Sequence, residues 1–337
     1  MANKQSLANK YRPQTFDDVS EQQSVRIILE NQIKNDNIKH AYLFCGGAGT
    51  GKTTTARIIA KMINQGKGKP IELDCASKNG VDDMRIVQDE CNTRPLNSKY
   101  KIFILDECHM LTVQAWNSML KILEEPPQYV VFLFCTTNPE KIIGTIMSRV
   151  QRFNFSRIST QGIVSRLTYI LQQEQINDYE QSAVEYIARL AKGGMRDAIT
   201  TLEKCLDYDY HLTLDNVHKV TSGGVTEQVM LQLLATLIHK DCGSALSQFN
   251  DIYLTGIDIS LFLKLYIDFL QNCVKYIITR NTSLITISDI TTNWLNENGR
   301  FLTQIRDQLM SALNLKTFYS SEDVKILLES WIVQLCS

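Results

Sequence analysis

A glycine-rich segment near the N-terminus carries the residue types that bind phosphate. Glycines in such a loop let successive backbone N–H groups approach phosphate oxygens without a Cβ in the way. The lysine then reaches the β- and γ-phosphates, the following threonine hydroxyl binds Mg²⁺, and the next helix contributes its N-terminal dipole. The alternative is a glycine turn with a surface lysine, but this loop follows an apolar run and precedes the helical stretch 54–63. The pattern G-x-x-x-x-G-K-[ST] and its helix start comprise Gly46, Gly47, Ala48, Gly49, Thr50, Gly51, Lys52, Thr53 and Thr54.

Two adjacent carboxylates, Asp106 and Glu107, end the apolar run 102–105. At the carboxyl end of a parallel strand, Asp106 would hold Mg²⁺ through water and Glu107 would polarise the water that attacks the γ-phosphate. An acidic strand end is ordinary by itself, and the P-loop makes the functional interpretation the favoured one. A later apolar run, 130–135, leads into Thr136-Thr137-Asn138, where a polar side chain could bind the γ-phosphate or the attacking water.

The elements that must position these residues alternate along the first half of the chain. Short apolar runs predict strands at Ala41–Cys45, Ile71–Asp74, 102–105 and 130–135, each expected to be buried on both faces. An apolar stripe at helical spacing over 113–123 ends at Pro126-Pro127. Alternating strands and helices predict an α/β fold, with a parallel sheet covered by helices on both faces.

Beyond residue 155 the strand signals stop and the sequence predicts helices. These cover Thr160–Gln173, 179–191, 196–206, 214–220, 259–278 and 302–313, and a last helix begins at Ser320 with Asp323 as a capping-box partner. Glycine-containing breaks fall at 193–194 and 222–224. We therefore predict three domains: an α/β nucleotide-binding domain at 1–157, a small helical domain at 158–223 and a second all-helical domain at 224–337.

The composition narrows the class of protein. With 337 residues, 44% hydrophobic and 21% charged, the chain is an ordinary globular protein, and its net charge of −1 argues against a partner held by bulk positive charge. The nine cysteines are scattered without a C-x-x-C pair, so we expect reduced core residues of a cytoplasmic protein. No apolar run approaches the roughly 18 residues of a membrane span, and the N-terminus lacks the apolar core of a signal peptide.

Six motifs occur in one order along the chain, and together they identify a family. The series resembles the clamp-loader branch of the AAA+ ATPases, and within it the gamma/tau subunits of bacterial DNA polymerase III, over residues 8–222. Each motif is weak alone, and six in register are specific. They are Tyr11-Arg12-Pro13-x-x-Phe16, the P-loop, Leu105-Asp106-Glu107, Leu123-Glu124-Glu125-Pro126-Pro127, Ser148-Arg149 followed by Gln151-Arg152-Phe153, and Gly194-Met195-Arg196-Asp197-Ala198.

The resemblance implies roles for matching positions of this sequence. Tyr11, Arg12 and Pro13 would line the adenine pocket. Thr137 corresponds to the sensor 1 residue, with Asn138 as the alternative. Arg196 corresponds to the sensor 2 arginine, which projects from the helical lid at 158–223 onto the γ-phosphate.

Arg149 corresponds to the arginine finger, which acts on ATP bound by the neighbouring subunit. A guanidinium delivered there is worth about 10³–10⁵ in rate, because phosphoryl transfer spreads negative charge over the equatorial oxygens. The helices at 224–337 would form an oligomerising collar. Candidate contacts to DNA, for which a solvated loop is the alternative, are Lys78, Asn79, Arg85, Thr112 and Gln114.

Three departures from the family pattern indicate a divergent member. The family usually has four zinc-binding cysteines between the helix after the P-loop and the next strand, and residues 64–70 of this chain contain none, so we predict no zinc. Val150 stands where a cysteine usually follows Ser-Arg, and Gly47-Ala48 stands where Pro-Arg is common. None of these changes removes a catalytic group.

The resemblance thus implies an ATP- and Mg²⁺-dependent subunit of a sliding-clamp loader. Its partners would be delta- and delta-prime-type subunits or copies of itself in a pentamer, a sliding clamp and primer–template DNA, with no membrane. One alternative is a hexameric AAA+ DNA motor of the branch-migration helicase type, against which the Ser-Arg motif and the helical C-terminal part argue. The other is a non-catalytic scaffold subunit, against which the intact Lys52, Thr53, Asp106 and Glu107 argue.

Overall fold

The computed structural model describes residues 5–221, 225–315 and 324–337. It divides into two compact units, one formed by Met1–Asn177 with Ile187–Glu203 and the other by Asp178–Tyr186 with Lys204–Ser337. The predicted break at 222–224, the domain boundary at 223/224 and the helix start at Ser320 with Asp323 lie outside the described residues. The division into three domains stays a prediction.

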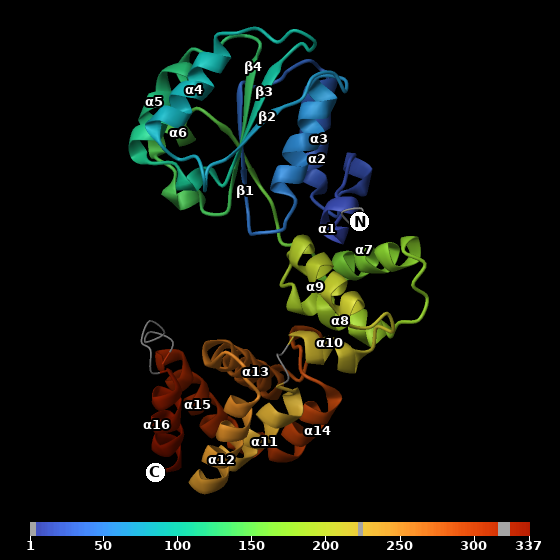
Figure 1. Ribbon diagram of the computed structural model, residues 1–337, viewed down its shortest axis with the longest axis vertical. Coiled ribbons are helices and arrows are strands. Elements are labelled where there is room, and N and C mark those ends of the chain that lie inside the picture. The colour runs from blue at the N-terminus through green and yellow to red at the C-terminus, as the bar shows by residue number, and fades with distance from the viewer. Residues whose placement is uncertain (1–4, 222–224, 316–323) are drawn as a thin grey trace. The chain divides into compact units, whose positions relative to one another are not determined.

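The first unit is built on a parallel sheet of five strands (Figure 1). The strands are β1 (Ala41–Cys45), β2 (Ile71–Asp74), β3 (Lys101–Asp106), β4 (Val130–Thr136) and β5 (Gln151–Asn154), in the order β2-β3-β4-β1-β5. Asp74 is in register with Asp106, and Cys45 with Thr136. The carboxyl ends of β1, β3 and β4, from which the predicted site residues follow, therefore lie side by side along the carboxyl edge of the sheet.

Helices cover both faces of this sheet, as the sequence predicted (Figure 1). One face packs on α4 (Val81–Cys91), α5 (Val113–Glu124) and α6 (Gly144–Met147), and the other on α2 (Gln23–Lys34) and α3 (Lys52–Ile63). Successive residues of a strand point to opposite faces, so Phe103 and Leu105 join one core and Ile102 and Ile104 the other. Short helical turns complete the unit: α1 (Leu7–Lys10), η1 (Phe16–Asp18), η2 (Cys108–Met110) and η3 (Pro139–Lys141).

Both edges of the sheet differ from the expectation. The prediction that Ile71–Asp74 is apolar on both faces was wrong, because β2 is an edge strand on which Glu72 and Asp74 are exposed, and Glu72 pairs with Arg57 at 2.6 Å. The opposite edge strand, β5, was not predicted. Only Phe153 of its four residues is buried, so its sequence lacks the continuous apolar run that identified the central strands.

Four helices follow the sheet: α7 (Thr160–Gln173), α8 (Gln181–Leu190), α9 (Met195–Tyr208) and α10 (Leu214–Thr221). The first of the four predicted helices has the bounds found. The second and third differ by one or two residues at each end, and the fourth differs by one residue at its end only. Tyr179, predicted as the first residue of α8, forms a bridge with Leu212 instead. α9 is continuous across the division between the units, which falls between Glu203 and Lys204.

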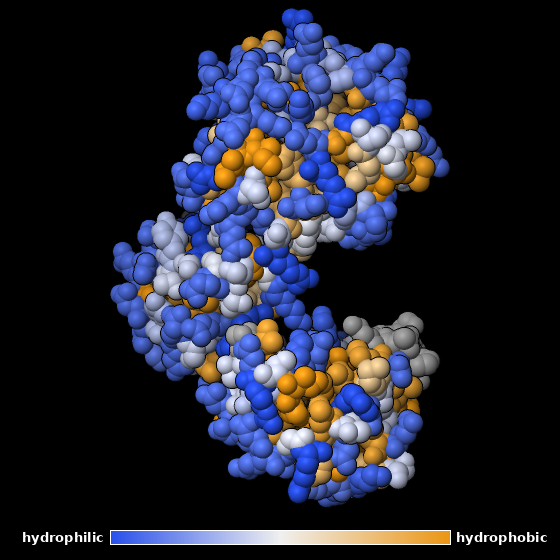
Figure 2. Space-filling model, turned by 180° about the vertical axis from the view of Figure 1, so that it is seen from behind, coloured by the Kyte–Doolittle hydropathy of each residue, from blue (hydrophilic) through white to orange (hydrophobic). Residues whose placement is uncertain are grey.

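The second unit is helical and has its own apolar core. Besides α10 and parts of α8 and α9, it contains α11 (Glu227–Ile238), α12 (Cys242–Leu254), α13 (Ile259–Thr279), η4 (Thr282–Leu284), α14 (Asp289–Asn298), η5 (Gly299–Phe301), α15 (Leu302–Leu315) and α16 (Val324–Cys336). Phe249, Tyr266 and Trp331 are among the large side chains of this core. Figure 2 shows that apolar side chains also reach the surface of this unit, where Leu254 and Ile278 are 71% and 66% exposed. Within the described ranges, no helix combines the length and apolarity needed to cross a bilayer.

The cysteines occupy the positions expected of core residues. All nine are free thiols and seven are buried, while Cys242 and Cys336 are partly exposed. Burial raises the pKa of the Cys108 and Cys135 thiols well above the usual value. These two thiols therefore stay protonated and unreactive beside the carboxyl edge of the sheet.

Asn64, which follows α3, offers a test of this packing. Its buried side chain donates from Nδ2 to the Tyr100 carbonyl oxygen (2.8 Å) and accepts from the Tyr100 N–H at Oδ1 (2.9 Å). We expect Asn64→Ala to lower the free energy of unfolding by about 1–3 kcal/mol, because backbone groups of Tyr100 lose their partners. Denaturation by urea would be followed through Trp116, with Trp294 and Trp331 replaced by Phe so that the signal reports on the first unit. Asn92→Ala, at an exposed position after α4, is the control, and an equal loss in both variants would contradict the prediction.

Candidate nucleotide-binding site

The P-loop joins the end of β1 to the first turn of α3. Gly49 and Gly51 have φ of 71° and 98°, the left-handed region that glycine adopts without strain, and Gly51 is the N-cap of α3. A Cβ on Gly49 would lie 3.0 Å from Gly194 Cα. The Met195 N–H donates to the Gly49 carbonyl oxygen at 3.0 Å. The loop is therefore packed against the segment that carries Arg196.

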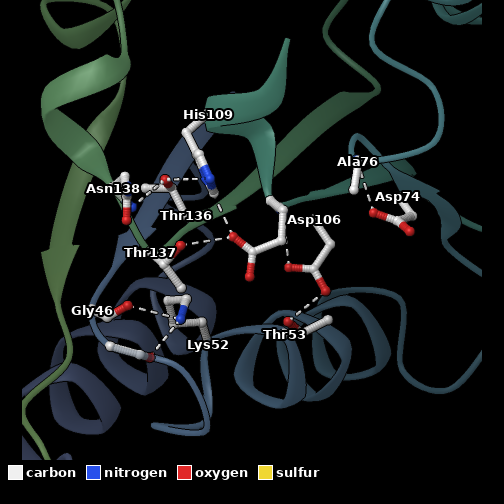
Figure 3. Close-up of polar contacts among 12 residues, drawn as sticks. Gly46, Lys52, Thr53, Asp74, Ala76, Asp106, His109, Thr136, Thr137 and Asn138 are labelled. Carbon is white, nitrogen blue, oxygen red and sulfur yellow. Dashed lines mark hydrogen bonds and ion pairs between the residues drawn. The ribbon is translucent and has the colours of Figure 1, made fainter. Parts of the chain in front are cut away.

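Lys52 lies inside the P-loop and is almost fully buried (Figure 3). Its Nζ donates to the carbonyl oxygens of Gly46 (2.9 Å) and Gly47 (2.7 Å). Burial lowers the pKa of Lys52, and the negative charges of Glu107 and Asp106 oppose that shift only in part. Carbonyl oxygens satisfy the N–H groups but do not neutralise the charge, so an anionic group entering the loop would be strongly favoured.

Thr53 and Asp106 place two oxygen ligands side by side. The Thr53 hydroxyl donates to Asp106 Oδ2 at 2.9 Å, and Asp106 Oδ1 accepts from the Glu107 N–H at 3.1 Å (Figure 3). Hydroxyl and carboxylate oxygens suit Mg²⁺, which is usually held by one or two protein ligands together with water and substrate phosphates. Among the described residues, no group of three or more His, Cys, Asp or Glu could hold a metal by itself. The donor set thus fits a magnesium ion shared with a phosphate chain.

The carboxylate of Glu107 is held from two sides. Its Oε2 accepts from the Thr137 hydroxyl at 3.0 Å and lies 3.2 Å from His109 Nδ1. The Thr136 hydroxyl oxygen lies 3.2 Å from the same nitrogen and accepts from the Asn138 N–H at 3.0 Å (Figure 3). Of the two sensor 1 candidates, Thr137 contacts Glu107 through its side chain. Sequence reasoning missed His109, whose only signal is its place two residues after Glu107.

A cavity of about 580 Å³ opens beside these groups, and most predicted site residues line it. They come from the N-terminal segment, the P-loop, the end of β3 and the start of α9. Gly46 and Gly47 do not line it and act through the carbonyl groups that bind Lys52. Predicted residues on the wall are Tyr11, Arg12, Pro13, Ala48, Gly49, Thr50, Gly51, Lys52, Thr53, Thr54, Asp106, Glu107 and Arg196.

The cavity wall also includes residues that sequence reasoning did not find. Arg166 of α7 donates from Nη2 to the Tyr11 carbonyl oxygen at 2.7 Å, which fixes the N-terminal segment against that helix. The Tyr11 hydroxyl donates to Glu174 at 2.5 Å. Burial, followed by this hydrogen bond, raises the pKa of Tyr11. Arg166 is a single arginine on an amphipathic helix, so nothing in its neighbourhood in sequence singled it out.

Arg149 does not line the cavity of its own chain. Its Nη2 pairs with Glu124 Oε1 at 2.5 Å, and its Nη1 donates to the Thr145 carbonyl oxygen at 2.6 Å. The side chain is 31% exposed, so the guanidinium lies at the surface between the ends of α5 and α6. The Arg149 guanidinium thus lies off the cavity of its own chain.

The DNA-contact candidates lie together at the beginnings of α4 and α5. The Thr112 N–H donates to the Asn79 carbonyl oxygen at 3.2 Å, which joins the two helix starts. The Thr112 side chain caps α5 by accepting from the Ala115 N–H. Lys78 and Gln114 are exposed, and Arg85 pairs with Asp82 at 2.8 Å on the exposed side of α4.

This sheet order, with a P-loop after β1, an Asp-Glu pair after β3 and an arginine from the helical segment at one cavity, defines a P-loop ATPase of the AAA+ class. The fold is shared with the Holliday junction branch migration motor RuvB of Thermotoga maritima, with a TM-score of 0.54 at 20% identity, covering 68% of this chain and 79% of that one. Two family models match: the DNA polymerase III delta subunit over residues 71–159 and the clamp loader subunit ATPase lid domain over 162–206.

Curated relatives identify the family within that class. The chain is 36% identical over 278 residues to the DNA polymerase III subunit gamma of Buchnera aphidicola, of which it covers 75%. It is 36% identical over 293 residues to the subunit tau of Bacillus subtilis and 33% identical over 275 residues to that of Escherichia coli. It spans about half the length of these tau subunits, 52% and 43%. The chain belongs to the gamma/tau family of DNA polymerase III subunits.

Two glycines of the P-loop provide a matched test of the site. Gly49→Ala would force a side chain into a left-handed backbone position and against Gly194, whereas a Cβ on Gly47 would meet only Thr50 Cγ2 at 3.9 Å. We expect Gly49→Ala to weaken ATP binding at least about tenfold, since backbone strain of this kind costs on the order of 1–3 kcal/mol. Gly47→Ala should bind nearly as the wild type does. Titration calorimetry with a non-hydrolysable ATP analogue measures both, and similar affinities for the two variants would contradict the prediction.

Proposed function

We propose that this protein is an ATP-hydrolysing subunit of a DNA polymerase sliding-clamp loader. The observation that carries the proposal is the single cavity that gathers the P-loop, Lys52, the Asp106-Glu107 pair and Arg196, in a chain of the gamma/tau family. Binding of ATP would favour the clamp-opening conformation, and hydrolysis triggered by DNA would release the closed clamp. The protein would act in the cytoplasm, on a clamp and primer–template DNA.

Nucleotide binding would use the whole cavity wall. Tyr11, Arg12 and Pro13 would surround the adenine, and the P-loop N–H groups with Lys52 would bind the phosphates. No acceptor is recorded within hydrogen-bonding distance of the Arg196 guanidinium among the described residues, which suits a role as a γ-phosphate ligand. Thr53 directly and Asp106 through water would hold Mg²⁺, which when bound neutralises charge developing on the phosphate oxygens.

Hydrolysis would follow from the placement of Glu107 beside Thr137. Glu107 would accept a proton from water as the water oxygen bonds to the γ-phosphorus and the bond to the β–γ bridging oxygen breaks. Lys52 and Arg196 would stabilise the charge on the departing phosphates. Arg149 would supply the remaining cation from a neighbouring subunit, so that hydrolysis depends on assembly.

Two surfaces away from the cavity would bind other subunits and DNA. Exposed apolar residues of the second unit, such as Leu254 and Ile278, fit a collar that holds delta- and delta-prime-type subunits or copies of this chain in a pentamer. The joined beginnings of α4 and α5 offer backbone N–H groups and the cations Lys78 and Arg85 to a DNA backbone.

One set of ATPase measurements separates this proposal from its rivals. A clamp-loader subunit should hydrolyse ATP faster when partner subunits, clamp and primed DNA are all present. A branch-migration type motor would be indifferent to the clamp, and a scaffold subunit would hydrolyse nothing under any condition. Either of these results would overturn the proposal.

Arg149→Ala is expected to leave ATP binding by the isolated chain unchanged, because the side chain lies off its own cavity. In the assembled complex the rate of hydrolysis should fall by about 10³ or more, the usual worth of a guanidinium at the transferring phosphoryl group. Steady-state phosphate release measures this effect. Arg152→Ala, three residues on and exposed, should retain normal rates, and a full rate in the Arg149 variant would remove the trans role.

Arg85→Ala is expected to weaken the stimulation of hydrolysis by primed DNA and to leave the basal rate unchanged. One lost phosphate contact should also reduce the slope of log affinity against log salt by about 0.9. Binding of fluorescent primed DNA across a salt series measures that slope. Lys61→Ala removes an exposed cation from α3, on the other face of the sheet, and should have no effect. Unchanged stimulation in the Arg85 variant would exclude this residue as a contact.

A further inference from the structure

Glu107 has an unusual backbone conformation for the residue proposed as the base. Glu107 has φ of 47° and ψ of 42°, a left-handed conformation that is strained for a non-glycine residue. The residue follows β3, which ends at Asp106, and is the N-cap of η2. Whatever holds the carboxylate determines which oxygen is available for chemistry.

The contacts around Glu107 distinguish its two oxygens. Oε2 lies within hydrogen-bonding distance of both the Thr137 hydroxyl and His109 Nδ1, at 3.0 and 3.2 Å. No donor to Oε1 is recorded among the described residues. One oxygen is therefore anchored by the Thr137 hydroxyl and faces His109, and the other is left to accept a proton.

The same contacts bear on which nitrogen of His109 carries a proton. A lone pair on Nδ1 would face a carboxylate oxygen at 3.2 Å with no hydrogen between them, which is repulsive. A hydrogen on Nδ1 would instead face two oxygen atoms, Glu107 Oε2 at 3.2 Å and the fully buried Thr136 hydroxyl oxygen at 3.2 Å. Only about 10% of the His109 side chain is exposed, so little water competes for these contacts.

We propose that His109 is a positioning residue for ATP hydrolysis. Its Nδ1–H, together with the Thr137 hydroxyl, holds Oε2 of Glu107 so that Oε1 is presented to the attacking water. The inference rests on the proposed function, because His109 is taken to position Glu107, the base of the proposed reaction. The competing explanation is that His109 only packs against the end of β4 and has no part in hydrolysis.

Three variants test the proposal in the assembled, DNA-stimulated complex. His109→Leu keeps the apolar bulk and removes the donor, and we expect kcat to fall by about 10- to 100-fold with KM for ATP unchanged, since a displacement of about 1 Å can cost 10² in rate. His109→Asn places an amide N–H where Nδ1–H lies, and should restore kcat to within a few-fold. Thermal unfolding of each variant accompanies the kinetics, so that a rate lost through misfolding is recognised.

The third variant, Glu107→Gln, separates the failure of this inference from that of the proposed function. With the carboxylate gone, adding His109→Leu should cause no further loss in single-turnover hydrolysis, because residues that act as a unit are not additive. A further tenfold loss in that background, or an Asn variant as slow as Leu, or an unchanged Leu variant, would overturn the role of His109. If Glu107→Gln alone leaves kcat intact, Glu107 is not the base and the proposed mechanism fails first.

Discussion

The site depends on a buried lysine, Lys52, whose ammonium group contacts carbonyl oxygens but, among the described residues, no anion. Removing Lys52 from water lowers its pKa, and its hydrogen bonds to Gly46 and Gly47 satisfy its N–H groups without cancelling its charge. The loop can keep this arrangement because β1 and α3 fix its two ends. A phosphate chain that enters the loop supplies the missing negative charge, so affinity for the nucleotide is built into the fold.

The parallel sheet brings the remaining groups to the same place. Since β1, β3 and β4 end at one edge, the P-loop, the Asp106-Glu107 pair and Thr137 converge although they are separated by many residues in the chain. The Gly194–Arg196 segment does not come from the sheet, and its contact with the P-loop backbone brings Arg196 to the same cavity. Arg149 stands apart from all of these, bound to Glu124, and its distance from the cavity is what makes an action on another subunit a coherent proposal.

Sequence reasoning predicted what rests on continuous apolar runs or on a fixed spacing. The central strands β1, β3 and β4, helix α7 and the P-loop were found because burial on both faces, a regular helical stripe or a spaced motif marks each of them. The edge strand β5 was missed because only Phe153 of its residues is buried, and β2 was assigned two apolar faces although Glu72 is exposed. Arg166 and His109 could not be found, since their roles come from contacts with Tyr11 and Glu107 that no local pattern encodes.

The close packing of Gly49 on Gly194 ties the P-loop to the start of helix α9. Backbone touches backbone there, with a hydrogen bond alongside, so neither side can yield by rotating a side chain. Helix α9 begins at the next residue and continues without a break from the first unit into the second. Since helices are stiff, the proposed action of Arg196 on a γ-phosphate would set the orientation of the first turn of α9, and with it that of the remaining turns of the same helix.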